Sequence, residues 1–129
     1  MSTDQSAERN KAFVRAHFEE FVNRKNAAVI LENMTADFYD HDGPGGKATD
    51  AAGDKAMMEA MYEQYPDLRV TIEDMIAEGD KVMCRNRWRG TEAVTGKKIE
   101  FQGFVLWRLE GGKLAERWAT VTPPREATR

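Results

Sequence analysis

The 129-residue chain contains a single cysteine, Cys84. One thiol cannot form an intramolecular disulfide or a cysteine metal cluster. Cys84 lies within a predicted strand, where a buried, unreactive thiol is favoured over a nucleophile. The sequence also lacks a run of the roughly 20 apolar residues that a membrane-spanning helix needs, and its first ten residues lack the hydrophobic core of a signal peptide. We therefore expect a cytoplasmic protein that does not enter membranes.

A basic run is absent too, and the net charge of the chain is −3. Proteins that bind nucleic acids or anionic membranes usually gather Lys and Arg on one face, so neither partner is expected. No internal repeat or low-complexity tract divides the chain. Its 129 residues suffice for one domain that buries roughly two-thirds of its unfolded surface. We assign residues 10–122 to this domain, 1–9 to a flexible N-terminus and 123–129 to a C-terminal tail.

The first half of the sequence has the periodicity of helices. Apolar residues recur at helical spacing over 10–22, which predicts an amphipathic helix. A short second helix is predicted over 27–33, followed by an extended segment over 35–42. The glycines and proline of residues 43–46 exclude regular structure there. A third helix is predicted over about 49–64, and Pro66 ends it.

The second half has the alternation of strands, predicted over 68–77, 82–89, 98–109 and 114–121. Gly111 and Gly112 form the turn between the last two strands, because glycine accepts the positive φ values of a tight hairpin. The strand over 98–109 is apolar on much of both faces, with Phe104 and Leu106 opposite the core face. That second face is expected to meet another protein surface. Helices followed by antiparallel strands indicate an α+β fold.

Several segments, taken in order, carry a resemblance to a known family. They are Asn10-Lys11, Tyr39-Asp-His-Asp-Gly-Pro44, Tyr65-Pro-Asp-Leu-Arg-Val70, Ala77-Glu-Gly-Asp-Lys-Val82, Arg89-Gly-Thr91, Phe101-Gln-Gly103 and Gly112-Lys-Leu-Ala-Glu-Arg-Trp118. From about residue 10 to 122 the chain resembles the SnoaL-like polyketide cyclases, within the nuclear-transport-factor-like superfamily. The resemblance implies a cone-shaped α+β barrel, in which three N-terminal helices pack on a curved, mostly antiparallel sheet around a cavity. It also implies a homodimer formed through the outer face of the sheet.

The resemblance further implies a reaction. Polyketide cyclases of this family close a carbon ring by an intramolecular aldol step, which requires no metal and no organic cofactor. A base removes a proton beside a carbonyl group, and a hydrogen-bond donor stabilises the enolate. Family members often carry an acid at the positions of Ala119 or Thr122, and neither of these residues can act as a base. The catalytic role is therefore expected from His41, Asp42 and Glu116.

Each of these candidates has a structural alternative. His41 matches the family's histidine at the cavity rim and is either a base or donor near physiological pH, or a residue that holds the glycine loop to the barrel. Glu116 is either a displaced catalytic acid or a structural acid paired with Arg85 or Arg87. Adjacent residues on an extended segment point in opposite directions, so Asp40, His41 and Asp42 are not expected to form a metal site.

The cavity wall is expected from residues on the faces that the fold turns inward, namely His17, Phe18, Met57, Met61, Asn86, Trp88 and Trp118. His17 lies in the apolar stripe of its helix and is either a core histidine or a ligand contact. Asn86 lies on an apolar strand face and needs a neighbour, a water or a ligand as its partner. Two functions remain open. One is a cofactor-free cyclase, isomerase or hydrolase for a small apolar carbonyl compound, and the other is a non-catalytic binding or dimerisation domain.

Overall fold

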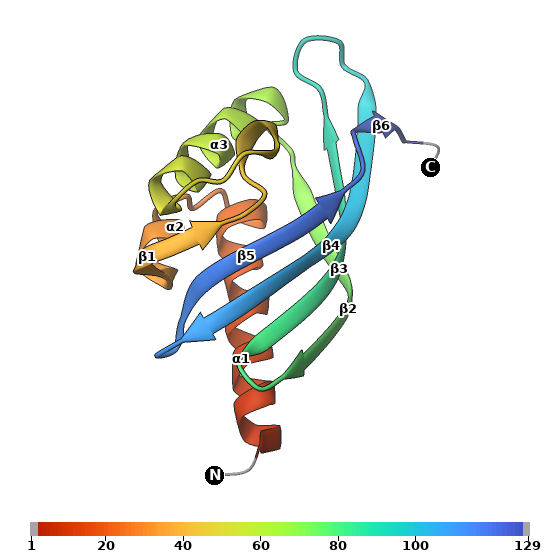
Figure 1. The fold of residues 1–129 in the computed structure, drawn as a ribbon. Helices are drawn as coiled ribbons and strands as arrows, with labels where there is room; N and C mark the ends of the chain where they lie inside the picture. Colours follow the sequence, from red (N-terminus) through yellow and green to blue (C-terminus); the bar gives the residue numbers. More distant parts are fainter. Residues whose placement is uncertain (1–2, 128–129) are drawn as a thin grey trace.

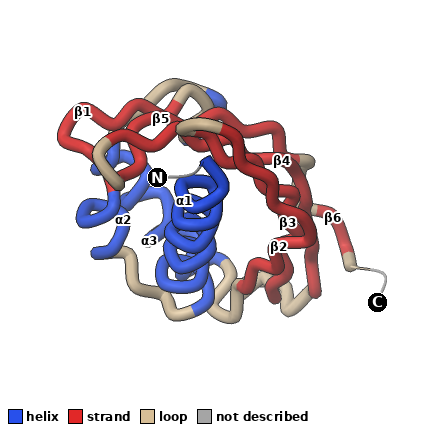
Figure 2. The backbone as a smooth tube through the Cα atoms, turned by 90° about the horizontal axis from the view of Figure 1, so that it is seen from below, coloured by secondary structure: helices blue, strands red, loops and turns tan. Residues whose placement is uncertain are grey.

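The computed structural model describes residues 3–127, in which helices pack against one side of a curved sheet (Figure 1). The helices are α1 (Thr3–Phe18), α2 (Ala28–Asn33) and α3 (Ala51–Gln64). The strands are β1 (Met34–Asp40), β2 (Arg69–Glu78), β3 (Lys81–Thr91), β4 (Lys98–Glu110), β5 (Lys113–Val121) and β6 (Arg125–Glu126). In the view from below, the strands curve around α1, and the other two helices lie beside it (Figure 2). The predicted α+β architecture is confirmed.

The sheet has the strand order β1-β5-β4-β3-β2, and β6 pairs with β4. Only the β1–β5 pair is parallel among these strands, and the other pairs are antiparallel. The expected mostly antiparallel sheet is therefore also confirmed. The β4–β5 hairpin turns at Gly111 and Gly112, whose φ values are 58° and 79°. This region favours glycine, because a side chain would clash with the backbone there.

Both ends of the described chain carry more regular structure than the sequence indicates. Helix α1 begins at Thr3 rather than Asn10, so residues 3–9, assigned to a flexible N-terminus, are helical. Once a helix has formed, each further residue adds one backbone hydrogen bond, so a helix can extend beyond its apolar stripe. At the other end, β6 lies in the segment assigned to the C-terminal tail, and it pairs with Ile99 and Glu100 of β4.

Two polar contacts fix the helices that border the inner face. Helix α1 continues as a wider π-helical turn over Glu19–Asn23. There the Asn23 side chain donates to the Val70 carbonyl at 3.3 Å and accepts from the Val70 N–H at 2.8 Å, which ties the helix end to β2. Helix α3 begins after Asp50, whose side chain accepts a hydrogen bond from the Gly53 N–H at 2.9 Å. This cap satisfies one of the free N–H groups of the first turn.

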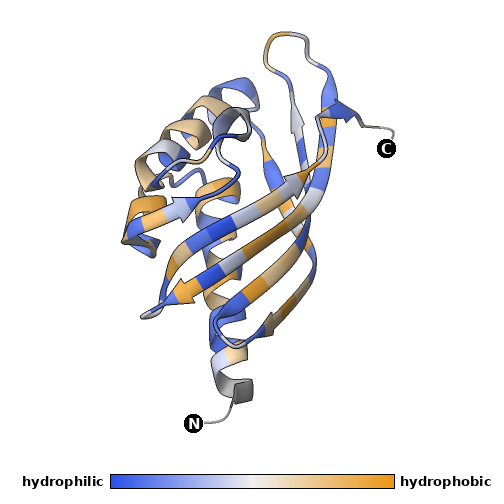
Figure 3. Ribbon diagram, viewed as in Figure 1, coloured by the Kyte–Doolittle hydropathy of each residue, from blue (hydrophilic) through white to orange (hydrophobic). Residues whose placement is uncertain are grey.

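Hydrophobic and polar residues alternate along the central strands (Figure 3). The inner face of β3 and β4 is buried against the helices, and its fully buried side chains include Val82, Cys84 and Val105. Burial raises the pKa of the Cys84 thiol to about 12, as expected for an unreactive core cysteine. Within residues 3–127, no helix is both long and apolar enough to cross a membrane.

Candidate functional site

A pocket of about 330 Å³ lies between the helices and the inner face of the sheet. Most of the residues expected at a ligand line it, namely His17, Phe18, Met57, Met61 and Trp88. Its wall also includes Met58 from the same helix face, and apolar residues that the sequence did not single out, namely Phe21, Ile30, Met34, Phe101 and Trp107. The pocket is therefore mostly apolar, and its few polar side chains stand out.

The most unusual of these polar side chains is Asp54, in the first turn of α3. It is only 5% exposed, and among the described residues no group donates a hydrogen bond to its Oδ1. Burial is the main reason that the pKa of Asp54 rises to about 8. A side-chain hydrogen bond with Asp40 and the negative charge of Asp40 raise it further, while Arg117 opposes the change. Asp54 can therefore exchange a proton near neutral pH.

Asp40, on β1, is a second buried acid and is completely buried. Nη1 of Arg117 donates to both of its carboxylate oxygens, at 3.0 and 2.9 Å, and the Asp42 N–H donates to Oδ1 at 2.9 Å. The parallel pairing of β1 with β5 places Asp40 opposite Arg117. Asp40 is the acceptor in all of these contacts. Asp54, with a pKa of about 8, is mostly protonated at neutral pH.

His17 supplies a second polar group at the pocket. It is 1% exposed, and burial, aided by the Arg117 charge, lowers its pKa to about 3, so the ring is neutral. Nδ1 lies 3.0 Å from the amide nitrogen of Asn33. With that amide as the donor, Nδ1 is the acceptor and the ring proton is on Nε2. Nε2 has no partner among the described residues, so it is a free hydrogen-bond donor beside the pocket.

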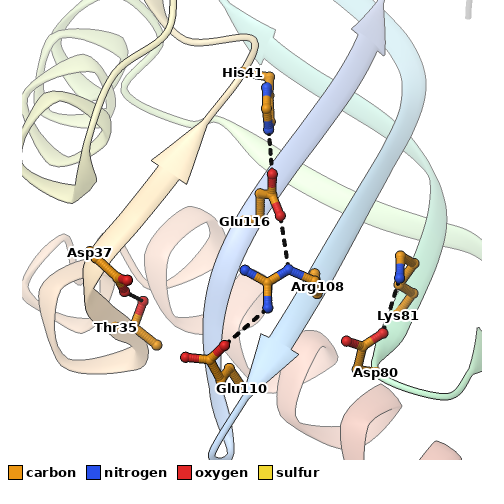
Figure 4. Close-up of polar contacts among 8 residues, drawn as sticks. All are labelled: Thr35, Asp37, His41, Asp80, Lys81, Arg108, Glu110 and Glu116. Carbon is orange, nitrogen blue, oxygen red and sulfur yellow. Dashed lines mark hydrogen bonds and ion pairs between the residues drawn. The ribbon is translucent and has the colours of Figure 1, made fainter.

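His41 and Glu116 lie elsewhere, in a polar chain on the outer side of the sheet (Figure 4). His41 Nε2 is 2.6 Å from Glu116, which also accepts from Arg108 at 2.8 Å, and Arg108 contacts Glu110 at 3.2 Å. Trp118 stacks on His41, with ring centroids 4.7 Å apart. Hydrogen bonds from Arg108 and then His41 lower the pKa of Glu116. None of His41, Glu116 and Trp118 lines the pocket described above.

The predicted partners of Glu116 were wrong. Arg108 faces Glu116 across the β4–β5 pair, whereas Arg85 contacts Asp74, and Arg87 contacts Glu73 and Glu100. Strand order and register decide this, because Arg85 and Arg87 are on β3, which β4 separates from β5, whereas Arg108 lies directly opposite Glu116.

Of the two remaining expected residues, Asp42 lines the pocket and Asn86 does not. Asp42 lines the pocket at an exposed position, and its Oδ2 accepts from the Ala119 N–H at 2.8 Å. Asn86 points into the core and is 1% exposed, but it is not among the residues that line the pocket. Neither the oxygen nor the nitrogen of its amide has a partner among residues 3–127. The side-chain amide of Asn86 is therefore a buried polar group that still needs a partner, as the sequence indicated.

The profile of the SnoaL-like polyketide cyclases matches residues 12–121. The chain belongs to the SnoaL-like polyketide cyclase family. No curated protein matches this family member. Solved structures are similar to this chain. One is AclR from Streptomyces galilaeus, a candidate hydroxylase, with 20% sequence identity and a TM-score of 0.80. The match covers 94% of this chain and 91% of AclR. IdmH from Streptomyces antibioticus, a candidate polyketide cyclase, has 23% identity and a TM-score of 0.78, over 87% and 91%. These likenesses show a shared fold.

The site of this SnoaL-like protein departs from the pattern that the family resemblance implies. Ala119 lines the pocket with a methyl group, and Thr122 instead exchanges hydrogen bonds with the backbone of Gln102. Asp54, from a different element, is the buried acid of the pocket. Among the described residues, no three His, Cys, Asp or Glu side chains are grouped as metal ligands.

A sequence signal for Asp54 existed. Asp54 precedes Met57 by three residues, Met58 by four and Met61 by seven, so these residues share one face of α3. An acid on such a face is rare unless it is paired, and it marks a site with a perturbed pKa.

Proposed function

We propose that this SnoaL-like protein is a cofactor-independent enzyme of the cyclase or isomerase type, with Asp54 as its general base. The observation that supports this most directly is a buried carboxyl group in an apolar pocket, with its pKa raised to about 8. A base works best when its pKa lies near the working pH, and a desolvated carboxylate is far more basic than one in water.

The proposed step is proton removal at a carbon beside a carbonyl group. The C–H bond breaks, an O–H bond forms on the Asp54 carboxylate, and the electron pair moves into the carbonyl group to give an enolate. The neutral His17 ring donates its Nε2–H to the enolate oxygen. The enolate carbon then attacks a second carbonyl in a cyclase, or a different carbon takes the proton back in an isomerase. Asp54 returns its proton in either case, and the balance needs no further reactant.

The substrate class follows from the wall of the pocket. Its volume of about 330 Å³ is at the lower end of the usual range for small-molecule sites, about 300–1,000 Å³. Aromatic and thioether side chains, such as Phe18, Trp88 and Met57, suit a small apolar molecule of irregular shape. Polar recognition is confined to a few groups, so we propose an apolar carbonyl compound as the ligand.

Hydrogen exchange on a simple ketone tests this function. In D2O at pH 8, NMR should show the protein speeding the loss of the α-proton signals of 2-tetralone, an apolar bicyclic ketone. Asp54→Asn should lower that rate by about 10²–10⁴-fold. Asp37→Asn is the matched control, since Asp37 is an exposed acid on β1 that contacts Thr35 (Figure 4). Equal rates in Asp54→Asn and Asp37→Asn would rule out Asp54 as the base.

A second candidate function is a non-catalytic small-molecule binder, and Ala119 favours it. This methyl group occupies a pocket position where an acid is often found in the family. A binder would hold 2-tetralone without speeding its exchange. Calorimetric binding that is equal in wild type and Asp54→Asn, without exchange in either, would select this alternative.

A further inference from the structure

Arg117 brings a cation to the wall of an apolar pocket. Its side chain is 14% exposed, and it lines the pocket together with aromatic and thioether side chains. Nη1 donates to both carboxylate oxygens of the buried Asp40, at 3.0 and 2.9 Å, and to the Asp42 carbonyl at 3.2 Å. These contacts hold the guanidinium group in place, and its planar shape then fixes the direction of its remaining donors.

The rest of the guanidinium group is available to a ligand. Nε and Nη2 of Arg117 donate no hydrogen bond to any of the described residues, because all of its bonds to them come from Nη1. These two atoms are not enclosed by the protein either. The enclosed side-chain nitrogens that lack a partner among the described residues are those of His17, Asn86, Trp88 and Trp107. The N–H groups on Nε and Nη2 are therefore open to a molecule in the pocket.

We propose that Arg117 is a ligand-binding residue that donates from Nε or Nη2 to the carbonyl oxygen of the ligand, while Asp40 holds the guanidinium group in position. The inference rests on the proposed function in one respect, because it takes the ligand to be a carbonyl compound. It adds a charged hydrogen-bond donor to the site, and such a donor binds an oxygen more strongly than a neutral donor does.

Arg117 and His17 lie against the same indole ring. The centre of the His17 ring is 5.5 Å from that of Trp107, and the guanidinium carbon of Arg117 is 5.8 Å from the centre of the Trp107 ring. All three residues line the pocket. Both side chains are thus close enough to contact one small ligand, and a cation there also stabilises an oxygen that becomes negative as an enolate forms.

The charges around Arg117 favour a neutral ligand. Asp40 already pairs with the guanidinium group, and Asp42 places a second carboxylate at the same pocket. A ligand carboxylate would be repelled by both of these negative groups, whereas a ketone oxygen accepts a hydrogen bond without adding a charge. We therefore expect a neutral carbonyl compound at Arg117, and not a carboxylic acid.

The test compares two ligands of nearly the same shape. 2-Tetralone carries one carbonyl oxygen, and tetralin is the hydrocarbon without it. Tryptophan fluorescence of the whole protein gives the dissociation constants, since Trp88 and Trp107 line the pocket. Arg117→Lys keeps a charge that can pair with Asp40 but lacks the planar fork of donors. It should weaken the binding of 2-tetralone by about tenfold or more and change that of tetralin by less than about twofold.

Arg108→Lys is the matched control, because Arg108 donates to Glu116 at 2.8 Å and does not line the pocket. It should leave both dissociation constants unchanged. If Arg117 only supported the structure, its loss would affect the two ligands alike. Equal changes for 2-tetralone and tetralin in Arg117→Lys, including no change, would therefore overturn the inference. Wild-type protein that binds neither ligand would overturn it too.

A second variant covers loss of folding. A lysine that does not reach Asp40 leaves a buried carboxylate without a partner, which can prevent folding. The double variant Asp40→Asn/Arg117→Met removes both charges, and the asparagine keeps an oxygen for the Asp42 N–H. It should show the same selective loss of 2-tetralone binding. A ratio of the two dissociation constants equal to that of wild type would overturn the inference.

The binding and exchange experiments fail independently. A selective loss of 2-tetralone binding in Arg117→Lys, with a wild-type protein that does not speed 2-tetralone exchange, would support the role of Arg117 and contradict the proposed enzyme. Exchange that depends on Asp54, with equal changes in the binding of both ligands in Arg117→Lys, would do the reverse.

Discussion

Arg117 donates two hydrogen bonds to the buried Asp40 carboxylate, at 3.0 and 2.9 Å, beside an apolar pocket that Arg117 and the buried acid Asp54 both line. The Asp40 carboxylate is thus paired with a cation, whereas burial raises the pKa of Asp54 to about 8. Stability and reactivity are both expected to reflect this arrangement.

The stability of the protein should fall as the pH rises toward 8. The pKa of Asp54 is about 8 in the folded state, against 3.8 for an unperturbed aspartate, as in the unfolded chain. Between these values the folded protein holds a proton that the unfolded chain has lost. The free energy of unfolding should therefore decrease with pH, by up to about 1.4 kcal/mol per pH unit from this group. Urea unfolding between pH 6.5 and 8.5 measures the slope. Asp54→Asn should flatten it relative to Asp37→Asn, and an unchanged slope would contradict the high pKa.

His17 should have the opposite effect in acid. Its pKa falls from 6.5 to about 3 on folding, so below pH 6.5 the unfolded chain takes up a proton that the folded protein does not. The free energy of unfolding should then drop as the pH falls from 6.5 toward 4, again by up to about 1.4 kcal/mol per unit. Gln cannot titrate, so urea unfolding of His17→Gln should show a shallower decline. A decline as steep as that of wild type would show that His17 is not buried in neutral form.

The outer face of the sheet should form a homodimer. Phe104 is 50% exposed there, and Leu106 and Trp118 lie beside it as directly opposed partners on β4 and β5. An apolar patch on a sheet surface usually marks an interface. Light scattering at micromolar concentration should give twice the chain mass of 14.6 kDa.

Phe104→Asp should reduce the measured mass to that of one chain. Val94→Asp is the matched control, because Val94 is 93% exposed but lies outside the strands. A single-chain mass for wild type would contradict the proposed dimer.

His41→Ala should change proton exchange on 2-tetralone by no more than about twofold. His41 contacts Glu116 and Trp118 outside the pocket, so its loss leaves Asp54 and His17 intact. Glu116→Gln should behave in the same way. A loss of about a hundredfold in either variant, the size expected for a general base, would transfer the catalytic role to the outer cluster.

Local patterns predicted the fold well, because each depends on neighbours in the sequence. Period and turn chemistry indicated the three helices, the later strands and the hairpin at Gly111 and Gly112. The strand faces also indicated much of the pocket wall, such as Phe18 and Trp88. Helix ends were less certain, since α1 begins earlier than its apolar stripe does.

The polar part of the site depends on long-range pairing. Asp40 and Arg117 are 77 residues apart and meet only because β1 pairs in parallel with β5. Alternation along β5 separates Glu116 and Trp118 from Arg117 and Ala119, but it does not say which set faces inward. The large apolar Trp118 suggested the wrong set, because the outer face of this sheet is apolar as well.

The pH dependence of proton exchange tests the central claim most directly. The rate of α-proton exchange on 2-tetralone, measured by NMR in D2O from pH 6 to 10 and corrected for the buffer reaction, should rise with a midpoint near 8, as the Asp54 carboxylate forms. Asp54→Asn should abolish this rise. Exchange with no midpoint in that range, or a rise that persists in Asp54→Asn, would contradict the assignment of Asp54 as the base.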